Sequence, residues 1–433
     1  MGFPVNGKPV SLLRMEKAHV LRALTSRPTN AIEAVDFILA TGLKLKASDI
    51  HICANTPTAD NPDKHLLRYR VYGKLQIVRA PFLATMYNEV VSRMKVLAEM
   101  STSEVGTPQD GQLVVNYNNE TAVLRISTVP SQGIDEICMR VQRSNNQTRT
   151  INQLQMTDEM RERLRKVITQ KSGLIVLNGP AGSGKTTTIY SILNTLVSPE
   201  KKIITAEDPV ETRLPYVNHT QVTAKASFAS LSRAFMRQDA DVIFLGEIRD
   251  QESALTALQL AQTGHLVVTT LHSRDAVGVI SRLEALEIHP NNIATTLICS
   301  LGQRLIPALC QTCRESTTVD EQTLQRLNAL FPVPEEAHFY KAGDGCERCV
   351  GGYSGRIPLF ELFVVDAELA DAINQRSSKV HITSLARTKG MATLAEEALL
   401  RFYYGYTDLD SIQSYISAAE ADRTTRKPPT AAT

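Results

Sequence analysis

Short aliphatic runs alternate with helix-forming segments through the middle of the chain. The runs cover residues 174–178, 203–205, 241–245 and 266–270. Helical patterns occur at 158–169, 187–196 and 251–262. Continuous apolar strands between helices are typical of a mostly parallel sheet covered on both faces. The pattern therefore predicts an α/β domain, and such domains bind ligands beyond the carboxyl ends of their strands.

The chain before this domain has a different pattern, in which β-rich segments are separated by breakers. Apolar residues recur at helical spacing from Ala31 to Leu43, so a helix comes first. The expected strands cover residues 49–53, 66–72, 113–117, 122–127 and 136–141. A second helix is expected at 81–100. Together these segments predict a small α+β domain.

Breakers and composition divide the chain further. The first 30 residues contain three prolines and a weakly helical middle from Ser11 to Leu24, which we interpret as a lead-in. The expected divisions are the lead-in at 1–30, the α+β domain at 31–145, the α/β domain at 146–309, a cysteine-bearing segment at 310–350, a helical region at 351–420 and a disordered tail at 421–433.

A glycine-rich segment follows the first aliphatic run of the α/β domain. Its sequence from Gly179 to Thr186 fits G-x-x-x-x-G-K-[ST], in which backbone N–H groups between a strand and a helix face phosphate oxygens. Lys185 would reach the β/γ-phosphates of ATP, and the Thr186 hydroxyl would complete a Mg²⁺ shell. The alternative is an ordinary strand-to-helix turn. The predicted nucleotide-binding residues are Gly179, Pro180, Ala181, Gly182, Ser183, Gly184, Lys185, Thr186 and Thr187.

Acidic residues follow the next two aliphatic runs. The segment AEDPVE (206–211) follows the run at 203–205, and GEIRD (246–250) follows the run at 241–245, so both lie at the same predicted edge of the sheet. ATP hydrolysis needs a carboxylate that orders the metal and a group that positions water. We expect Glu207 to be the catalytic base or the water-positioning group, and Glu247 to hold Mg²⁺ or its water. The alternative is that these acids cap the helices that follow, and it is strongest for Asp250.

Two histidines bracket the last run. His265 and His272 are seven positions apart, so they lie at opposite ends of the strand, which argues against a shared metal site. His272 lies at the nucleotide edge and is a candidate γ-phosphate or subunit-contact sensor, with a structural role as the alternative.

Composition narrows the class of protein. The chain has 433 residues, of which 43% are hydrophobic and 21% charged, as in ordinary globular proteins. A formal net charge of +2 gives no global attraction to nucleic acid. No apolar run reaches the length that spans a bilayer, and the first 20 residues lack the apolar block of a signal peptide. We therefore expect a cytoplasmic protein.

The cysteines point to a metal. Four of the seven form two C-x-x-C pairs, Cys310 with Cys313 and Cys346 with Cys349. Four thiolates can close a tetrahedral shell round Zn²⁺ with no open position, so the predicted site is structural.

The motifs together resemble a known family. The segments GPAGSGKTT, ITAEDPVE, FLGEIRD and TGHLVVTTLHS stand in the order of the Walker A, Asp, Walker B and His boxes of the secretion ATPases of type II secretion and type IV pilus systems. Further similar segments are ASDIHI, RYRVYG, QDG, LRISTVP, QRL and GMATL. The cysteine region, with GGYSGR and FEL, resembles assembly and secretion members, whereas retraction members usually lack it.

The resemblance implies a RecA-like P-loop motor preceded by a PAS-like α+β domain and assembled as a ring hexamer. In that family, arginines of the α+β domain reach the nucleotide, and here Arg125 and Arg140 are the leading matches. Two segments depart from the family pattern, QDGQ where QDGR is common and RQDAD where RQDPD is common. Weaker arginine candidates are Arg68, Arg70, Arg233, Arg237 and Arg249.

The implied activity is Mg²⁺-dependent ATP hydrolysis that drives pilus or pseudopilus assembly. The implied partners are further copies of the chain, an inner-membrane platform protein and, indirectly, pilin-like subunits, with no nucleic acid. Membrane association would then be peripheral and through proteins. The alternatives are a retraction or conjugative-type motor, a nucleic-acid translocase and a non-hydrolysing scaffold.

Overall fold

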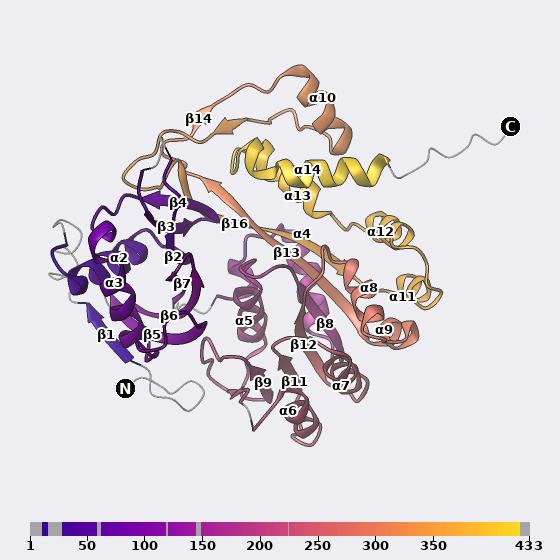
Figure 1. The fold of residues 1–433 in the computed structure, drawn as a ribbon. Helices are drawn as coiled ribbons and strands as arrows, with labels where there is room; N and C mark the ends of the chain where they lie inside the picture. The colour runs from indigo at the N-terminus through magenta and orange to yellow at the C-terminus, as the bar shows by residue number, and fades with distance from the viewer. Residues whose placement is uncertain are drawn as a thin grey trace. The chain divides into compact units, whose positions relative to one another are not determined.

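The computed structural model of the chain describes residues 11–15, 28–58, 62–117, 120–143, 149–223 and 225–424. The chain divides into two compact units, residues 1–146 and 147–433 (Figure 1). Most of the expected lead-in, residues 144–148 and residues 425–433 of the expected tail lie outside the described residues. Residues 421–424 of that tail continue α14 (Leu409–Thr424). No helix in the described ranges is long and apolar enough to cross a membrane.

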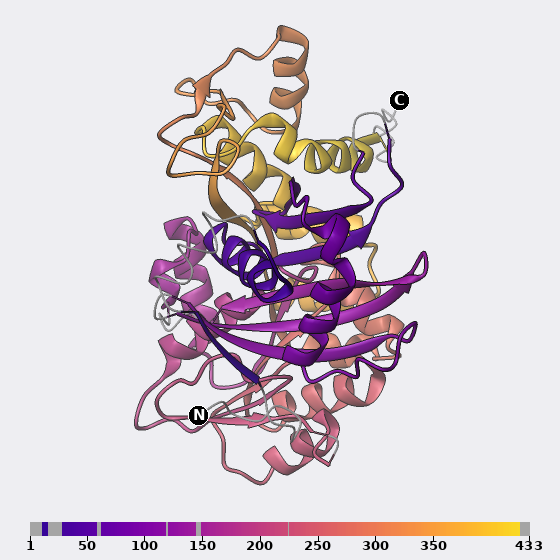
Figure 2. The same cartoon turned by 60° about the vertical axis from the view of Figure 1, so that its left-hand side comes forward.

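The first unit is a sheet with two helices on one face. The order of its described strands is β1-β5-β6-β7-β2-β3-β4, with β1 parallel to β5 and the other pairs antiparallel. Figure 2 shows α2 (Ala31–Lys44) and α3 (Leu83–Leu97) against the same face. The strands are β1 (Ser11–Met15), β2 (Asp49–Ala54), β3 (His65–Val71), β4 (Lys74–Val78), β5 (Gln109–Tyr117), β6 (Glu120–Ser131) and β7 (Ile134–Arg143).

The structure confirms both helices and all five predicted strands of this unit, with ends displaced by a few residues. It adds β4, an edge strand in which Leu75 and Ile77 are exposed. The expectation of helix from Ser11 was wrong over the described residues 11–15, because these residues pair with β5. Pairing with a neighbouring strand overrides weak local helix propensity.

The second unit is built on a larger sheet. The order of its described strands is β10-β9-β11-β12-β8-β13-β16, in which neighbours are parallel except for β13 and β16. These strands are β8 (Gly173–Asn178), β9 (Ile203–Glu207), β10 (Val217–Gln221), β11 (Val242–Leu245), β12 (Leu266–Leu271), β13 (Leu297–Leu309) and β16 (Tyr353–Val364). A mostly parallel, two-faced sheet of this kind confirms the predicted α/β class.

Alternate residues of the buried strands enter two separate cores. Leu174 and Val176 of β8 belong to the core that also contains residues of α7 and α9. Ile175 and Leu177 belong to the core with α4 and α5. The helices are η1 (Ile151–Gln153), α4 (Asp158–Ile168), α5 (Lys185–Leu196), α6 (Phe228–Phe235), α7 (Gln251–Gln262), α8 (Gly278–Ala285) and α9 (Pro290–Thr296).

The C-terminal part begins differently from the expected helical region at 351–420. Tyr353–Val364 form β16, which pairs with β13 along most of its length, so the region opens with a strand of the central sheet. Four helices follow, α11 (Ala367–Asn374), α12 (Lys379–Thr388), α13 (Leu394–Tyr403) and α14 (Leu409–Thr424). The segment between the two strands carries α10 (Glu321–Leu330) and the short pair β14 (Glu315–Ser316) and β15 (Tyr340–Lys341).

One buried carboxylate joins β16 to two other segments. Glu361 accepts hydrogen bonds from the backbone N–H groups of Ala276, at 2.6 Å, and Leu394, at 2.9 Å. Ala276 lies in the loop after β12, and Leu394 begins α13. Burial raises the pKa of Glu361 to about 7, although the two N–H groups act in the opposite direction. The folded protein therefore binds a proton near neutral pH that the unfolded chain has lost.

This raised pKa predicts a pH dependence of stability. Because the folded pKa of Glu361 exceeds the unfolded value of 4.5, its contribution to stability falls as pH rises from about 4.5 to 7. We expect the melting temperature of Glu361→Gln, relative to the parent, to rise from pH 5 to pH 8, by the equivalent of about 1–3 kcal/mol. Thermal unfolding of both proteins at several pH values measures this difference. A constant difference across that range would contradict the assignment.

Candidate functional site

The glycine-rich loop between β8 and α5 has a backbone that only glycine adopts easily. Gly179, Gly182 and Gly184 have φ of 151°, 74° and 87°. A Cβ on Gly179 would lie 2.4 Å from the Gln303 carbonyl oxygen, and one on Gly184 would lie 2.8 Å from the Gln303 amide nitrogen. Side chains at these positions would clash or strain the backbone. The loop is therefore a glycine cradle before a helix N-terminus, the arrangement that binds phosphate.

Polar groups of the loop fit a phosphate ligand. The Lys185 ammonium donates to the carbonyl oxygens of Gly179, at 2.6 Å, and Pro180, at 3.0 Å, so it lies along the loop. Burial lowers the pKa of Lys185, and the Glu247 carboxylate opposes that effect. The buried Ser183 hydroxyl has no hydrogen-bond partner among the described residues. A cationic donor and an unsatisfied hydroxyl beside exposed glycine backbone are suited to phosphate oxygens.

Two further strands contact the cradle. Gln303 of β13, which is buried, accepts a hydrogen bond from Thr188 Oγ1 at 2.9 Å. Arg356 of β16 donates to the Gly182 carbonyl oxygen at 3.5 Å. Both residues lie in segments that resemble the family, QRL and GGYSGR, but no role was predicted for either. Their contacts depend on β13 and β16 passing beside the loop, which local sequence does not reveal.

Glu247 and His272, from the ends of β11 and β12, lie together. His272 Nε2 is 3.2 Å from one Glu247 oxygen, and Arg249 Nε donates to the other at 2.7 Å. Thr186 lies in the first turn of α5. Thr186 and Glu247 supply the oxygen ligands that Mg²⁺ prefers, so they are the residues that would hold it. When bound, Mg²⁺ would neutralise phosphate charge.

Glu207 ends β9 and is almost completely buried. Its two oxygens accept hydrogen bonds from Tyr190 and Thr205, each at 2.5 Å, and His219 Nδ1 lies 2.7 Å from the oxygen that Thr205 contacts. Neither Tyr190 nor His219 was predicted from the sequence to take part in the site. Asp250 instead caps α7, with its side chain accepting the Ser253 N–H at 2.8 Å, which is the capping role considered as its alternative.

The arginines expected to reach nucleotide are grouped within the first unit. Arg125 of β6 pairs across the sheet with Arg140 of β7, and Asp49 of β2 is paired with both Arg140 and Arg70. Asp49 is 3.4 Å from Arg140 Nε and 3.8 Å from Arg70 Nε. Arg68, two residues before Arg70, lies on the same side of the sheet by strand alternation. Two guanidinium groups, those of Arg70 and Arg140, therefore flank the Asp49 carboxylate on this face.

Arg233 and Arg237, the two weaker arginine candidates near α6, belong to the second unit. Arg233 Nη1 donates to Glu252 at 2.5 Å, and Arg237 donates to the Arg233 carbonyl oxygen at 3.2 Å. Both lie at or just beyond the end of α6 in the second unit. These contacts fit surface arginines of the motor domain.

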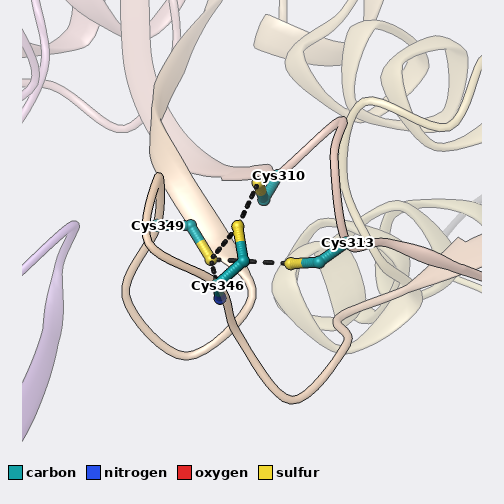
Figure 3. A group of neighbouring side chains, drawn as sticks. All are labelled: Cys310, Cys313, Cys346 and Cys349. Carbon is teal, nitrogen blue, oxygen red and sulfur yellow. Dashed lines mark hydrogen bonds between the residues drawn. The ribbon is translucent and has the colours of Figure 1, made fainter.

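The four cysteines of the two C-x-x-C pairs meet at one point (Figure 3). Their sulfur atoms all lie within 4.8 Å of one another, with Cys310 to Cys346 at 3.8 Å and Cys313 to Cys349 at 3.5 Å. Cys310 follows β13, and the second pair precedes β16, so the cluster closes the end of this strand pair. Four converging thiols fit Zn²⁺, which when bound would supply a structural crosslink.

The fold and the loop together define a P-loop ATPase domain with a tetracysteine cluster. Comparison with family models matches residues 27–414 to "Type II/IV secretion system protein". The chain belongs to this family, as its motifs had indicated.

Two curated relatives and one solved structure are similar to the chain. The type IV pilus assembly ATPase PilB of Thermus thermophilus is 38% identical over 84% of this chain, which spans 41% of that protein. The type II secretion system protein E of Dickeya dadantii is 34% identical over 88% of this chain and 74% of its own length. The ATPase DotB of Legionella pneumophila has the same fold, with a TM-score of 0.62, 20% identity and coverage of 94% and 99%.

The tetracysteine cluster predicts one bound zinc ion for each chain. We expect Cys346→Ser to lose the metal and to unfold at a lower temperature, because three thiolates cannot close the shell. Elemental analysis of purified protein, together with thermal unfolding, measures both effects. Cys138→Ser, which changes an exposed cysteine of the other unit, is the matched control and should keep the zinc. Zinc retained at the parent level in Cys346→Ser would exclude this ligand set.

Proposed function

We propose that this chain hydrolyses ATP with Mg²⁺ as the motor of a type IV pilus or type II pseudopilus assembly machine. The observation that carries the proposal is the glycine cradle with Lys185, beside a sheet edge that also presents Glu207 and Glu247. Family membership and the names of the relatives give the cellular setting. We place the protein at the cytoplasmic face of the inner membrane, held there by protein partners.

The residues divide the work by their surroundings. Lys185 neutralises charge on the β/γ-phosphates, and the N-terminus of α5 favours the same charge. Both oxygens of Glu207 already accept hydrogen bonds, so of the two roles predicted for it we favour the orientation of water over proton abstraction. Glu247, which contacts His272, holds the metal or its water. His272 senses whether the γ-phosphate is present.

The negative charge of the transition state calls for arginines, and we propose that a neighbouring chain supplies them. Transition-state charge on a transferring phosphoryl group is stabilised by arginines, whose contribution is on the order of 10³–10⁵ in rate. We propose that Arg125 and Arg140, which are paired across β6 and β7, supply them within a homo-hexameric ring. Hydrolysis would then move one unit against the other and transmit force to a membrane platform protein that handles pilin-like subunits.

The tetracysteine cluster favours assembly over retraction, because retraction members of the family usually lack the cysteine region. Nucleic-acid translocation is the rival activity of another class. A net charge of +2 gives no support to it.

The roles proposed for Lys185 and Glu207 predict different effects when each residue is substituted. Lys185→Ala should weaken ATP binding and abolish turnover, whereas Glu207→Gln should bind ATP but lower kcat about 100-fold or more. Asp250→Asn is the matched control, since Asp250 caps α7; its kcat should stay near the parent value. A steady-state phosphate-release assay with nucleotide titrations measures these effects. Parent-level turnover by Glu207→Gln would show that the carboxylate has no role in hydrolysis.

A composite site predicts that ATPase activity depends on assembly. Arg125→Ala and Arg140→Ala should lower kcat about 10-fold or more with little change in nucleotide affinity. The exposed Arg79, changed to Ala, is the control from the same unit. Activity measured against protein concentration, alongside molar mass, should rise as rings form. A monomer that hydrolyses ATP at the full rate would contradict the ring site, and strong salt-sensitive stimulation by DNA would favour the translocase.

A further inference from the structure

The Glu207 carboxylate is enclosed by donors from three elements. Tyr190 of α5 contacts Oε2, whereas Thr205 of β9 and His219 of β10 contact Oε1. The side chains of Glu207 and His219 are only 4% and 2% exposed. The rings of Tyr190 and His219 are nearly parallel, at 12°, with centroids 6.1 Å apart. Each of the two carboxylate oxygens therefore accepts at least one hydrogen bond.

A backbone group fixes the tautomer of His219. The Leu214 N–H donates to His219 Nε2 at 3.0 Å, so this nitrogen carries no proton. In the neutral ring the proton must then lie on Nδ1, which points at Glu207 Oε1. His219 therefore acts as a donor toward the carboxylate.

Tyr190 is fixed in the same way. The Thr212 N–H donates to the Tyr190 hydroxyl oxygen at 3.2 Å, and the hydroxyl itself donates to Glu207 Oε2. Burial, and then the charge of Glu207, raise the pKa of Tyr190, so it stays protonated. Two backbone donors, at residues 212 and 214, thereby orient both rings.

Three donors from the described residues face the Glu207 carboxylate, two at Oε1 and one at Oε2, and a carboxylate can accept from all three. This set of donors also holds the carboxylate in one rotamer at the end of β9. Catalytic groups gain from such fixed orientation, because water need not be reorganised when charge develops.

We propose that His219 and Tyr190 are positioning residues that hold the Glu207 carboxylate in one orientation for hydrolysis, an inference that rests on the proposed ATPase function. Neither residue need touch the nucleotide. His219 belongs to β10, the edge strand of the sheet, so the site extends one strand beyond the acids that the motifs mark.

A purely structural role is the competing explanation, since the same bonds attach β10 and the segment around Leu214 to the sheet. The two roles differ in what a substitution changes. Loss of attachment lowers stability and disturbs packing, whereas loss of orientation lowers kcat with ATP affinity preserved.

Asn and Leu at position 219 separate these effects, because they have similar size and only Asn can donate near the position of Nδ1. We expect His219→Leu to lower kcat about 10- to 100-fold with less than about a threefold change in KM and in the affinity for a fluorescent ATP analogue. His219→Asn should recover most of that loss. Tyr190→Phe, which removes only the hydroxyl, should also lower kcat selectively.

The outcomes are distinct. Equal kcat in His219→Leu and the parent would overturn the inference, as would equal losses in the Leu and Asn variants, which would indicate packing. A loss explained by unfolding at the assay temperature, measured by circular dichroism, would also count against it. If the parent itself shows no ATPase activity as an assembled ring, the proposed function fails, and the inference fails with it for that separate reason.

Discussion

The site depends on the common edge to which β8, β9, β11 and β12 deliver their last residues. Because the strands are parallel, one edge receives the phosphate loop, Glu207, Glu247 and His272 from segments far apart in the sequence. The sheet is buried on both faces, and its alternating side chains are fixed in two cores. Displacement of any of these strands would separate phosphate-binding groups from the acids.

Most of this arrangement could be predicted from the sequence, because its signals are local. The apolar runs predicted the strands, and the polar residues after each run predicted the site. The residues that the sequence did not indicate are those whose contacts depend on pairing between strands far apart in the chain. β10, with the sequence VNHTQ, contains no aliphatic run, so His219 was not considered. β16 pairs with β13 across an intervening segment of more than 40 residues, which hid the contact of Arg356 with the phosphate loop.

The two C-terminal strands connect the nucleotide edge to the rest of the second unit. β13 places Gln303 against the cradle and ends at the tetracysteine cluster, while Glu361 of β16 holds the loop after β12 and the start of α13. Arg304 adds donors to the carbonyl oxygen of Ser273, at 3.3 Å, and to that of Arg274. The loop after β12, which follows His272, is therefore hydrogen-bonded to both β13 and β16.

The central claim is that phosphate transfer occurs at this sheet edge with Glu207 facing the attacking water. A high-resolution structure of the assembled protein with ADP, Mg²⁺ and aluminium fluoride tests it most directly. We expect the fluoride complex above the glycine cradle, with a water between it and Glu207 and an arginine from a neighbouring chain in contact. A complex bound elsewhere, or one whose attacking water is held by other groups with Glu207 turned away, would contradict it.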